Sequence, residues 1–234
     1  MKVLKLCPPT WKSLIPSSLT ALAAATTADN NTVVGYEALN DVTTGANNTA
    51  MGDRAGDKLT TGAANTAIGA SALGTSTTAS NNTAIGYAAL DANTTADNNT
   101  AVGKDSLTAN TTGNYNTGVG LNSLVSNTNG SYNTAIGVQT LNSNTTATHN
   151  VAVGYSALYS VTTQGDNTAV GNYALYSNTG ARNVAIGYTA LYANTTGSDN
   201  VALGLTSLRF NTTGGNNVAV GKEALRNNTT ASYN

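Results

Sequence analysis

Few residues of this chain have side chains suited to catalysis, and they are scattered. His149, in the stretch "TATHN", is the only histidine, and Cys7 is the only cysteine. No serine or cysteine stands around His149 in a pattern that would pair a nucleophile with a base. A single cysteine also leaves no disulfide framework and no cysteine metal site. We therefore predict that His149 is a solvent-facing turn residue, that there are no catalytic residues, and that the chain is not an enzyme.

The charged stretch "GDRAGDKLTTG" contains the other candidate for site chemistry. Asp53 and Asp57 could supply oxygen ligands of the kind that calcium takes. Arg54 and Lys58 stand beside them and would repel a cation. The glycines of the chain also lack the strand-to-helix context of a phosphate-binding loop. We expect a solvated, irregular turn here, and neither a metal site nor a cofactor site.

Tyrosines form the third group, because an exposed tyrosine ring offers a sugar an apolar face and a hydroxyl. They stand directly after a glycine at Tyr36, Tyr87, Tyr155 and Tyr188, and directly after a leucine at Tyr159, Tyr176 and Tyr192. The same rings could pack between chains, which we favour over glycan binding. The candidates for either role are Tyr155, Tyr159, Tyr176, Tyr188 and Tyr192.

These residues stand at fixed places in a repeat, which the stretch "NTAIGYAAL" at 82–90 illustrates. The glycine of this phrase recurs at Gly35, Gly52, Gly69, Gly86, Gly103, Gly120, Gly137, Gly154, Gly171, Gly187, Gly204 and Gly221. Ten of the eleven intervals are 17 residues, and the exception is 16 because "NTTG" is shortened to "NTG" at 178–180. Such a period indicates a stacked repeat architecture.

Each repeat begins with an asparagine, followed by Thr or Val, a small residue, an apolar residue and the glycine. A leucine stands four residues after the glycine in eleven of the twelve copies. We predict that the asparagines form a structural ladder of side-chain amides that satisfy one another and the turn backbone. The ladder consists of Asn31, Asn48, Asn65, Asn82, Asn99, Asn116, Asn133, Asn150, Asn167, Asn183, Asn200 and Asn217.

Seventeen residues are too few for two helices, and the content of Thr, Asn and Gly disfavours helix. The repeat therefore predicts an all-β fold, a parallel β-solenoid of about twelve 17-residue coils. Strand alternation places Thr83 and Ile85 on one face and Ala84 and Gly86 on the other. We expect Ile85 and Leu90, with their equivalents, to be the large buried side chains of each coil. The solenoid domain is expected at 30–234, after an attachment, capping or leader segment at 1–29.

The composition limits the partners. With 10 Lys and Arg against 11 Asp and Glu, and 9% charged residues, no basic face is available for nucleic acid or anionic lipid. No apolar run is long enough to span a membrane, so no membrane insertion is expected. Two large apolar side chains per coil are few for an independent core, and the last copy ends at Asn234 without a distinct cap. Both features predict that the chain associates with itself.

The phrases "NNTAIG", "NNTAVG" and "NNVAVG" resemble the core of the head repeats of YadA-like trimeric autotransporter adhesins. The longer phrase "NTAIGYAALDANTTADN" is similar to repeats of phage tail-fibre proteins. The resemblance covers residues 30–234. It implies a left-handed β-roll, a homotrimer, and use as a binding surface or spacer. The repeats here are longer than is common in adhesin heads, and we expect no anchor, stalk or chaperone segment within these 234 residues.

The favoured function is a structural and adhesive segment of an extracellular fibre on a cell surface or virion. Its partners would be further copies of the chain and a cell-surface glycan or host receptor. An alternative is a filament that stacks end to end through the coil at Asn234. Ice binding through the Thr face ranks lower, because Val replaces Thr at Val151, Val184, Val201 and Val218.

Overall fold

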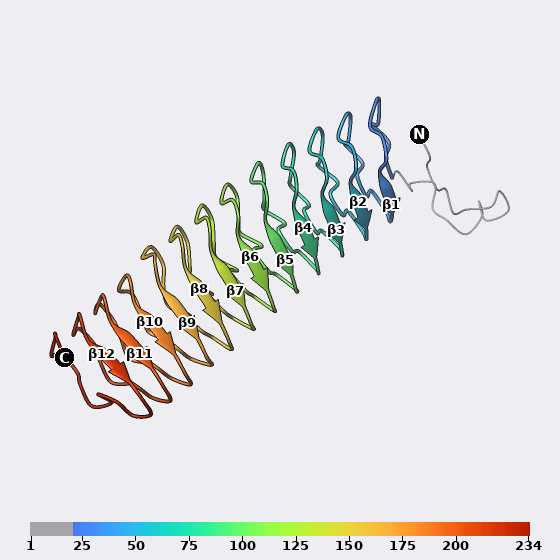
Figure 1. The fold of residues 1–234 in the computed structure, drawn as a ribbon. Helices are drawn as coiled ribbons and strands as arrows, with labels where there is room; N and C mark the ends of the chain where they lie inside the picture. The colour runs from blue at the N-terminus through green and yellow to red at the C-terminus, as the bar shows by residue number, and fades with distance from the viewer. Residues whose placement is uncertain (1–20) are drawn as a thin grey trace. The chain divides into compact units, whose positions relative to one another are not determined.

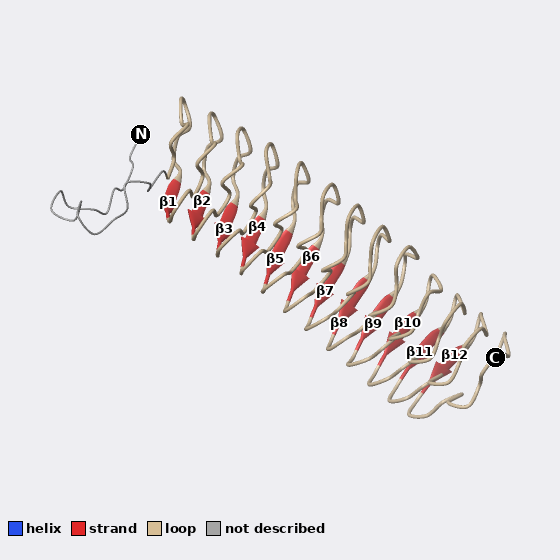
Figure 2. Cartoon of the chain, turned by 180° about the vertical axis from the view of Figure 1, so that it is seen from behind, coloured by secondary structure: helices blue, strands red, loops and turns tan. Residues whose placement is uncertain are grey.

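The computed structural model describes residues 21–234, and most of the segment expected at 1–29 lies outside them. The described chain divides into two units, 21–112 and 113–234. Each unit is a parallel β-solenoid without helices, with one short strand in each coil and loops between (Figures 1 and 2). This confirms the predicted fold class and repeat. Residues 21–29 also contact the first coil, since the N–H groups of Leu22 and Ala24 donate to the carbonyls of Ala38 and Asn40.

Every strand has three residues and begins directly after a repeated asparagine. The first unit holds β1 (Thr32–Val34), β2 (Thr49–Met51), β3 (Thr66–Ile68), β4 (Thr83–Ile85) and β5 (Thr100–Val102). The second unit holds β6 (Thr117–Val119), β7 (Thr134–Ile136), β8 (Val151–Val153), β9 (Thr168–Val170), β10 (Val184–Ile186), β11 (Val201–Leu203) and β12 (Val218–Val220).

Within each unit, equivalent residues of consecutive strands pair with one another. In the first unit Thr66 pairs with Thr83 and Ile68 with Ile85. The register also holds between β9 and β10, where Thr168 pairs with Val184 although the coil is one residue shorter. The missing residue lies in the loop at 178–180, where a length change does not affect the strands. Each sequence position therefore becomes a column of stacked side chains.

The two residues predicted to share a face, Thr83 and Ile85, do share one, but the prediction that Ile85 and its equivalents are buried was wrong. Ala84 is fully buried, whereas Ile85 is 36% exposed, and Ile186 in the second unit is 43% exposed. The alanine faces the interior and the larger apolar residue faces outward. The physical reason is that the leucine supplies the large buried side chain of most coils, and the strand adds the small alanine beside it in the interior.

The leucine column fills the interior, as the sequence predicted. Leu90 and Leu107 in the first unit and Leu158 and Leu175 in the second are fully buried. These leucines have left-handed backbone angles, with φ of 52° at Leu90. Two other residues of the coil, apart from its glycine, share this conformation, so the chain turns sharply within 17 residues. Such backbone costs about 1 kcal/mol or more per non-glycine residue.

The repeated glycine is required for both conformation and space. Gly86 has φ of 137°, which other residues rarely adopt. A Cβ atom there would lie 2.5 Å from the carbonyl oxygen of Gly103, the equivalent glycine of the next coil. The glycines therefore permit adjacent coils to approach to sheet distance where each strand ends.

Candidate functional site

The asparagine ladder lies inside the solenoid and uses its polar atoms for structure. The Oδ1 atom of Asn48 accepts from the backbone N–H of Asn65 at 2.9 Å and from its Nδ2 at 3.0 Å. Asn65 Nδ2 also donates to the Ala79 carbonyl at 2.8 Å. The ladder asparagines are almost fully buried from Asn48 to Asn217. Because these amides are bonded within the protein, they leave no open ligand site.

A second asparagine column lies in the "NTTG" segment, and we did not predict it from the sequence. Asn194 Nδ2 donates to Asn178 Oδ1 at 2.6 Å and to the Gly197 carbonyl at 2.8 Å. Asn211 bonds to Asn194 in the same way at 2.9 Å. These asparagines are fully buried. Their recurrence three residues after the leucine in most copies was the sequence signal for this second ladder, although Val42, Ser76 and Val161 replace asparagine in three copies.

The charged stretch of the second copy forms ion pairs with the coil before it. Arg54 lies 3.3 Å from Glu37, and Lys58 lies 3.2 Å from Asp41. Lys58 is also 3.4 Å from Asp57. Within the described part of the chain, no group of three or more His, Cys, Asp or Glu side chains could hold a metal ion. No helix among residues 21–234 is long and apolar enough to cross a membrane.

His149 is exposed, at the turn position where we placed it. Its ring stacks on Tyr132 with centroids 5.1 Å apart, and Tyr132 stacks on Tyr115 at 5.1 Å. Its Nδ1 atom lies 3.1 Å from the hydroxyl oxygen of Thr148. These contacts contain no carboxylate that would orient the imidazole as a base, and the Thr148 hydroxyl is on the adjacent residue. His149 therefore belongs to an aromatic stack on the surface.

The candidate tyrosines gather in the second unit. Tyr159, Tyr176 and Tyr192 occupy one column, with ring centroids 5.1 Å and 5.3 Å apart and nearly parallel planes. Each ring follows the buried leucine of its coil, which fixes the direction in which it points. The structure thus brings three of the five candidates into a continuous stack.

Tyr173 joins this stack to the other two candidates, and sequence reasoning missed it. Its ring lies 5.2 Å from Tyr155 and 6.4 Å from Tyr188, nearly perpendicular to both. It also lies 5.7 Å from Tyr176. Burial, followed by neighbouring Tyr155, raises the pKa of the Tyr173 hydroxyl, and burial raises that of Tyr176. Both hydroxyls therefore carry their protons at neutral pH and can donate hydrogen bonds.

The tyrosine column continues into two arginines at the same place in the next coils. The Arg209 guanidinium carbon lies 6.0 Å from the centre of the Tyr192 ring and 5.2 Å from that of Phe210. Arg226 lies 5.2 Å from the same Phe210 ring. We call Tyr159, Tyr176, Tyr192, Arg209 and Arg226 the aromatic–guanidinium column. It runs along the coils that carry β8 to β12 (Figure 1).

Both arginines of this column have unused hydrogen-bonding capacity. The Nε atoms of Arg209 and Arg226 are buried and have no hydrogen-bond partner. No ion pair joins either guanidinium to a carboxylate within residues 21–234, whereas Arg182 pairs with Asp199 at 2.7 Å. The column therefore ends in two cations held mainly by aromatic contacts.

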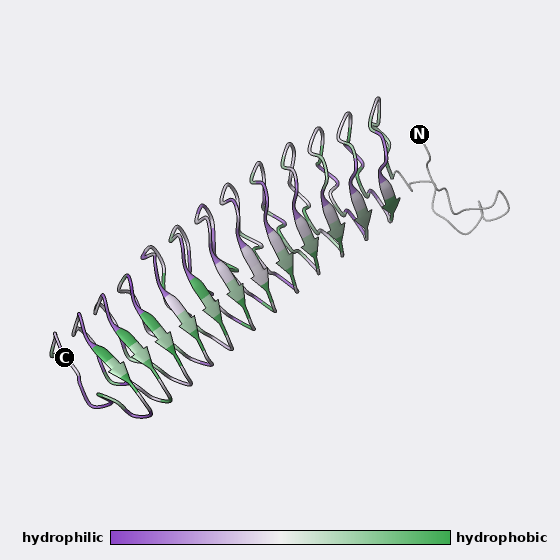
Figure 3. Ribbon diagram, viewed as in Figure 1, coloured by the Kyte–Doolittle hydropathy of each residue, from purple (hydrophilic) through white to green (hydrophobic). Residues whose placement is uncertain are grey.

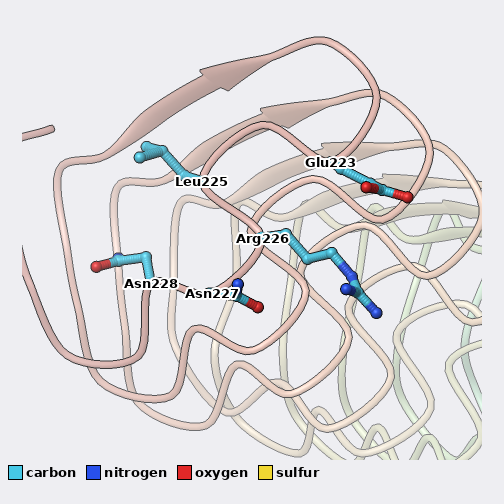
Figure 4. Close-up of a pocket in the computed structure, with 5 residues that line it drawn as sticks. All are labelled: Glu223, Leu225, Arg226, Asn227 and Asn228. Atoms are coloured by element: carbon cyan, nitrogen blue, oxygen red, sulfur yellow. The ribbon is translucent and has the colours of Figure 1, made fainter.

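A hollow of about 450 Å³ lies at the last coil and is lined by Glu223, Leu225, Arg226, Asn227 and Asn228 (Figure 4). In this view Leu225 and Asn228 extend to one side, and Arg226 extends to the other. A ligand site needs polar groups that converge on one place. The hollow lacks this convergence, so we do not assign it a ligand.

On the outward side, every strand has Thr or Val at its first position and an apolar residue at its third position. Figure 3 shows apolar residues concentrated along the strands, most strongly where Val replaces Thr as the first residue, in β8, β10, β11 and β12. The exposed members of this outward apolar face are Val34, Met51 and Ile85 in the first unit, and Ile136, Val151, Val170, Ile186, Val218 and Val220 in the second.

Comparisons of the chain with models of protein families, with curated protein sequences and with solved structures found no match. The function is therefore argued from two surfaces, which are the outward apolar face and the aromatic–guanidinium column.

Proposed function

We propose that this chain is a structural and adhesive segment of an extracellular fibre, exposed on a cell surface or virion. In this proposal it is a homotrimer in which copies of the chain cover one another's outward apolar faces. The β-solenoid fold is consistent with such a fibre-like role.

The observation that carries the proposal is the outward apolar face. Ile85 is 36% exposed, Ile136 is 42% exposed and Ile186 is 43% exposed, although each lies in a strand with a neighbour on both sides. Large exposed patches of apolar residues are uncommon on soluble monomers and mark interaction surfaces. Burial of apolar surface contributes about 25 cal/mol per Å². A partner that covers this face would therefore stabilise the assembly.

A second copy of the chain suits this face better than an unrelated protein does. Equivalent positions recur at every coil, so two parallel copies can match coil to coil along each unit. The side chains involved are mostly β-branched, and they lose little rotamer freedom on burial. The resemblance to trimeric surface-fibre repeats supports three chains and a location outside the cell.

Few charges oppose such association. Only 9% of the residues are charged and the formal net charge is −1. Of the residues on the outward apolar face, none is charged. Repulsion between copies is therefore weak, and salt is expected to have little effect on the assembly.

The test is the mass of the purified protein, measured by light scattering at micromolar concentration. We expect the mass of three chains, and a pure monomer would overturn the proposal. The double variant Ile136→Lys with Ile186→Lys places charges on the outward apolar face and should give monomers. Electron microscopy separates discrete rods from indefinite filaments, and filaments would favour end-to-end stacking instead.

The matched control is Thr163→Lys with Thr196→Lys. Both threonines are exposed in loops of the same unit, away from the strands. This control carries the same added charge, and we expect it to retain the three-chain mass. Circular dichroism of all variants checks that the solenoid is folded. If the control and the isoleucine double variant both dissociate to the same extent, the cause is the added net charge, and the proposed interface is contradicted.

A further inference from the structure

We infer that the aromatic–guanidinium column of the second unit, with Tyr155, Tyr173, Tyr188 and Phe210 beside it, binds an acidic saccharide chain. The ligand class is a linear carbohydrate that carries carboxylate or sulfate groups. This binding surface does not depend on the number of chains in the assembly.

The anionic character of the ligand follows from the two arginines. The guanidinium carbons of Arg209 and Arg226 both lie 5.2 Å from the centre of the Phe210 ring, so two like charges share one aromatic ring. Neither guanidinium has a carboxylate partner within residues 21–234. A carboxylate or sulfate would relieve the repulsion and accept hydrogen bonds from the guanidinium groups.

The carbohydrate character follows from the tyrosines. Tyr155 is 41% exposed and Tyr188 is 53% exposed, and both rings stand beside Tyr173. An exposed tyrosine ring packs on the apolar face of a sugar while its hydroxyl bonds to sugar hydroxyls.

The stacking pattern disfavours single-stranded nucleic acid as the occupant. Bases bind by stacking on open aromatic faces. Tyr176 is covered on its two sides by Tyr159 at 5.1 Å and Tyr192 at 5.3 Å, so the column presents ring edges and hydroxyls. Nucleic acid affinity also needs several phosphate contacts, and this column offers two cations.

The length of the column favours a chain over a monosaccharide. Its members come from five consecutive coils, one planar group per coil. Neighbouring coils repeat at the sheet spacing of about 4.8 Å. A polymer of repeated sugar units can therefore meet the tyrosines with some units and the arginines with its acidic groups.

The test is binding of the intact protein to immobilised polygalacturonate, heparin, neutral dextran and oligo-dT. We expect binding to one or both acidic polysaccharides and not to dextran. The double variant Arg209→Gln with Arg226→Gln should weaken that binding by about tenfold or more, because two charge-assisted contacts are lost. Tyr188→Ala should weaken it with the charge unchanged.

The matched control is Arg182→Gln, which removes an exposed arginine of the same unit that pairs with Asp199 outside the column. It should leave binding unchanged, and thermal unfolding checks the fold of every variant. Four outcomes would overturn the inference: no binding to either acidic polysaccharide, equal binding to dextran, preference for oligo-dT, or equal loss in the control. If the arginine variant instead changes the mass of the particle, the column is a contact between chains and the inference fails.

Discussion

The side-chain Oδ1 atom of Asn65 accepts a hydrogen bond from the backbone N–H of Asn82, in the next coil, at 3.0 Å. Asn82 Nδ2 lies 3.3 Å from the same oxygen and also donates to the Ala96 carbonyl at 2.9 Å. One buried amide thus ties its own coil to the next. A narrow solenoid with room for one leucine per coil uses these bonds in addition to apolar burial. The asparagines therefore determine stability, and function is assigned to the surface columns.

Replacement of one ladder asparagine should lower stability markedly. In Asn133→Ala, the N–H of Asn150 loses an acceptor at 3.1 Å and the Ala147 carbonyl loses a donor at 2.8 Å. The Ala147 carbonyl keeps Asn144 Nδ2 as a donor at 3.3 Å. One unsatisfied buried N–H costs about 1 to 3 kcal/mol, so we expect a loss of about that size. The measurement is the midpoint of urea unfolding.

Asn142→Ala is the matched control for this substitution. Asn142 lies in a loop of the same unit and is only half-buried. We expect its effect to stay within about 0.5 kcal/mol. Similar midpoints for the two variants would show that the ladder does not contribute to stability.

The period and the strand positions could be predicted because identical residues must stack when coils of equal length stack. Which face of the strand lies inside the solenoid could not be predicted. Alternation shows that Thr83 and Ile85 share one face, but it does not show which face is inside. That choice depends on the width of the coil, which follows from the leucine opposite and from backbone turns that no local pattern indicates. The usual preference for buried isoleucine gave the wrong answer.

The aromatic cluster was predicted in part for a similar reason. Tyr159, Tyr176 and Tyr192 share one place in the repeat, so their stacking follows from the period. Arg209 stands at the same place, and the column could have been extended to it from the sequence. Tyr173 was missed because its place holds mostly polar residues in other coils, and a contact between different columns depends on the shape of the turn.

The stability of the first unit should depend on pH through Asp57 and Asp91. Burial raises the pKa of both carboxyls above the ordinary value of 3.8, and the charge of Asp57 adds to the effect on Asp91. The folded chain therefore binds these protons more tightly than the unfolded chain does. Ionising these two carboxyls lowers the unfolding free energy. This loss is absent below pH 3.8 and develops as the pH rises through the raised pKa values.

Asp91→Asn tests this dependence. The variant cannot ionise at this position, so at neutral pH we expect a higher urea midpoint than in the parent protein. Below the ordinary pKa of aspartate, the urea midpoints of the variant and the parent protein should differ less. The Arg182–Asp199 pair acts in the opposite direction, because Arg182 lowers the pKa of Asp199. Arg182→Gln is therefore the control. We expect it to lower the urea midpoint at neutral pH, and we expect this loss of stability to fade in acid. A parallel pH profile for Asp91→Asn and the parent would contradict the assignment.

The left-handed backbone positions predict that some glycine substitutions stabilise the protein. Ala64 is exposed and has φ of 58°, whereas its neighbour Ala63 is not in the left-handed region. The left-handed conformation costs a non-glycine residue about 1 to 2 kcal/mol. Glycine elsewhere costs about 0.5 to 1 kcal/mol through the entropy of the unfolded chain. We therefore expect Ala64→Gly to raise the unfolding free energy by about 0.5 to 1 kcal/mol and Ala63→Gly to lower it by a similar amount. Urea midpoints that shift in the same direction would contradict this account, because the two variants remove the same methyl group and differ in the backbone conformation at that residue.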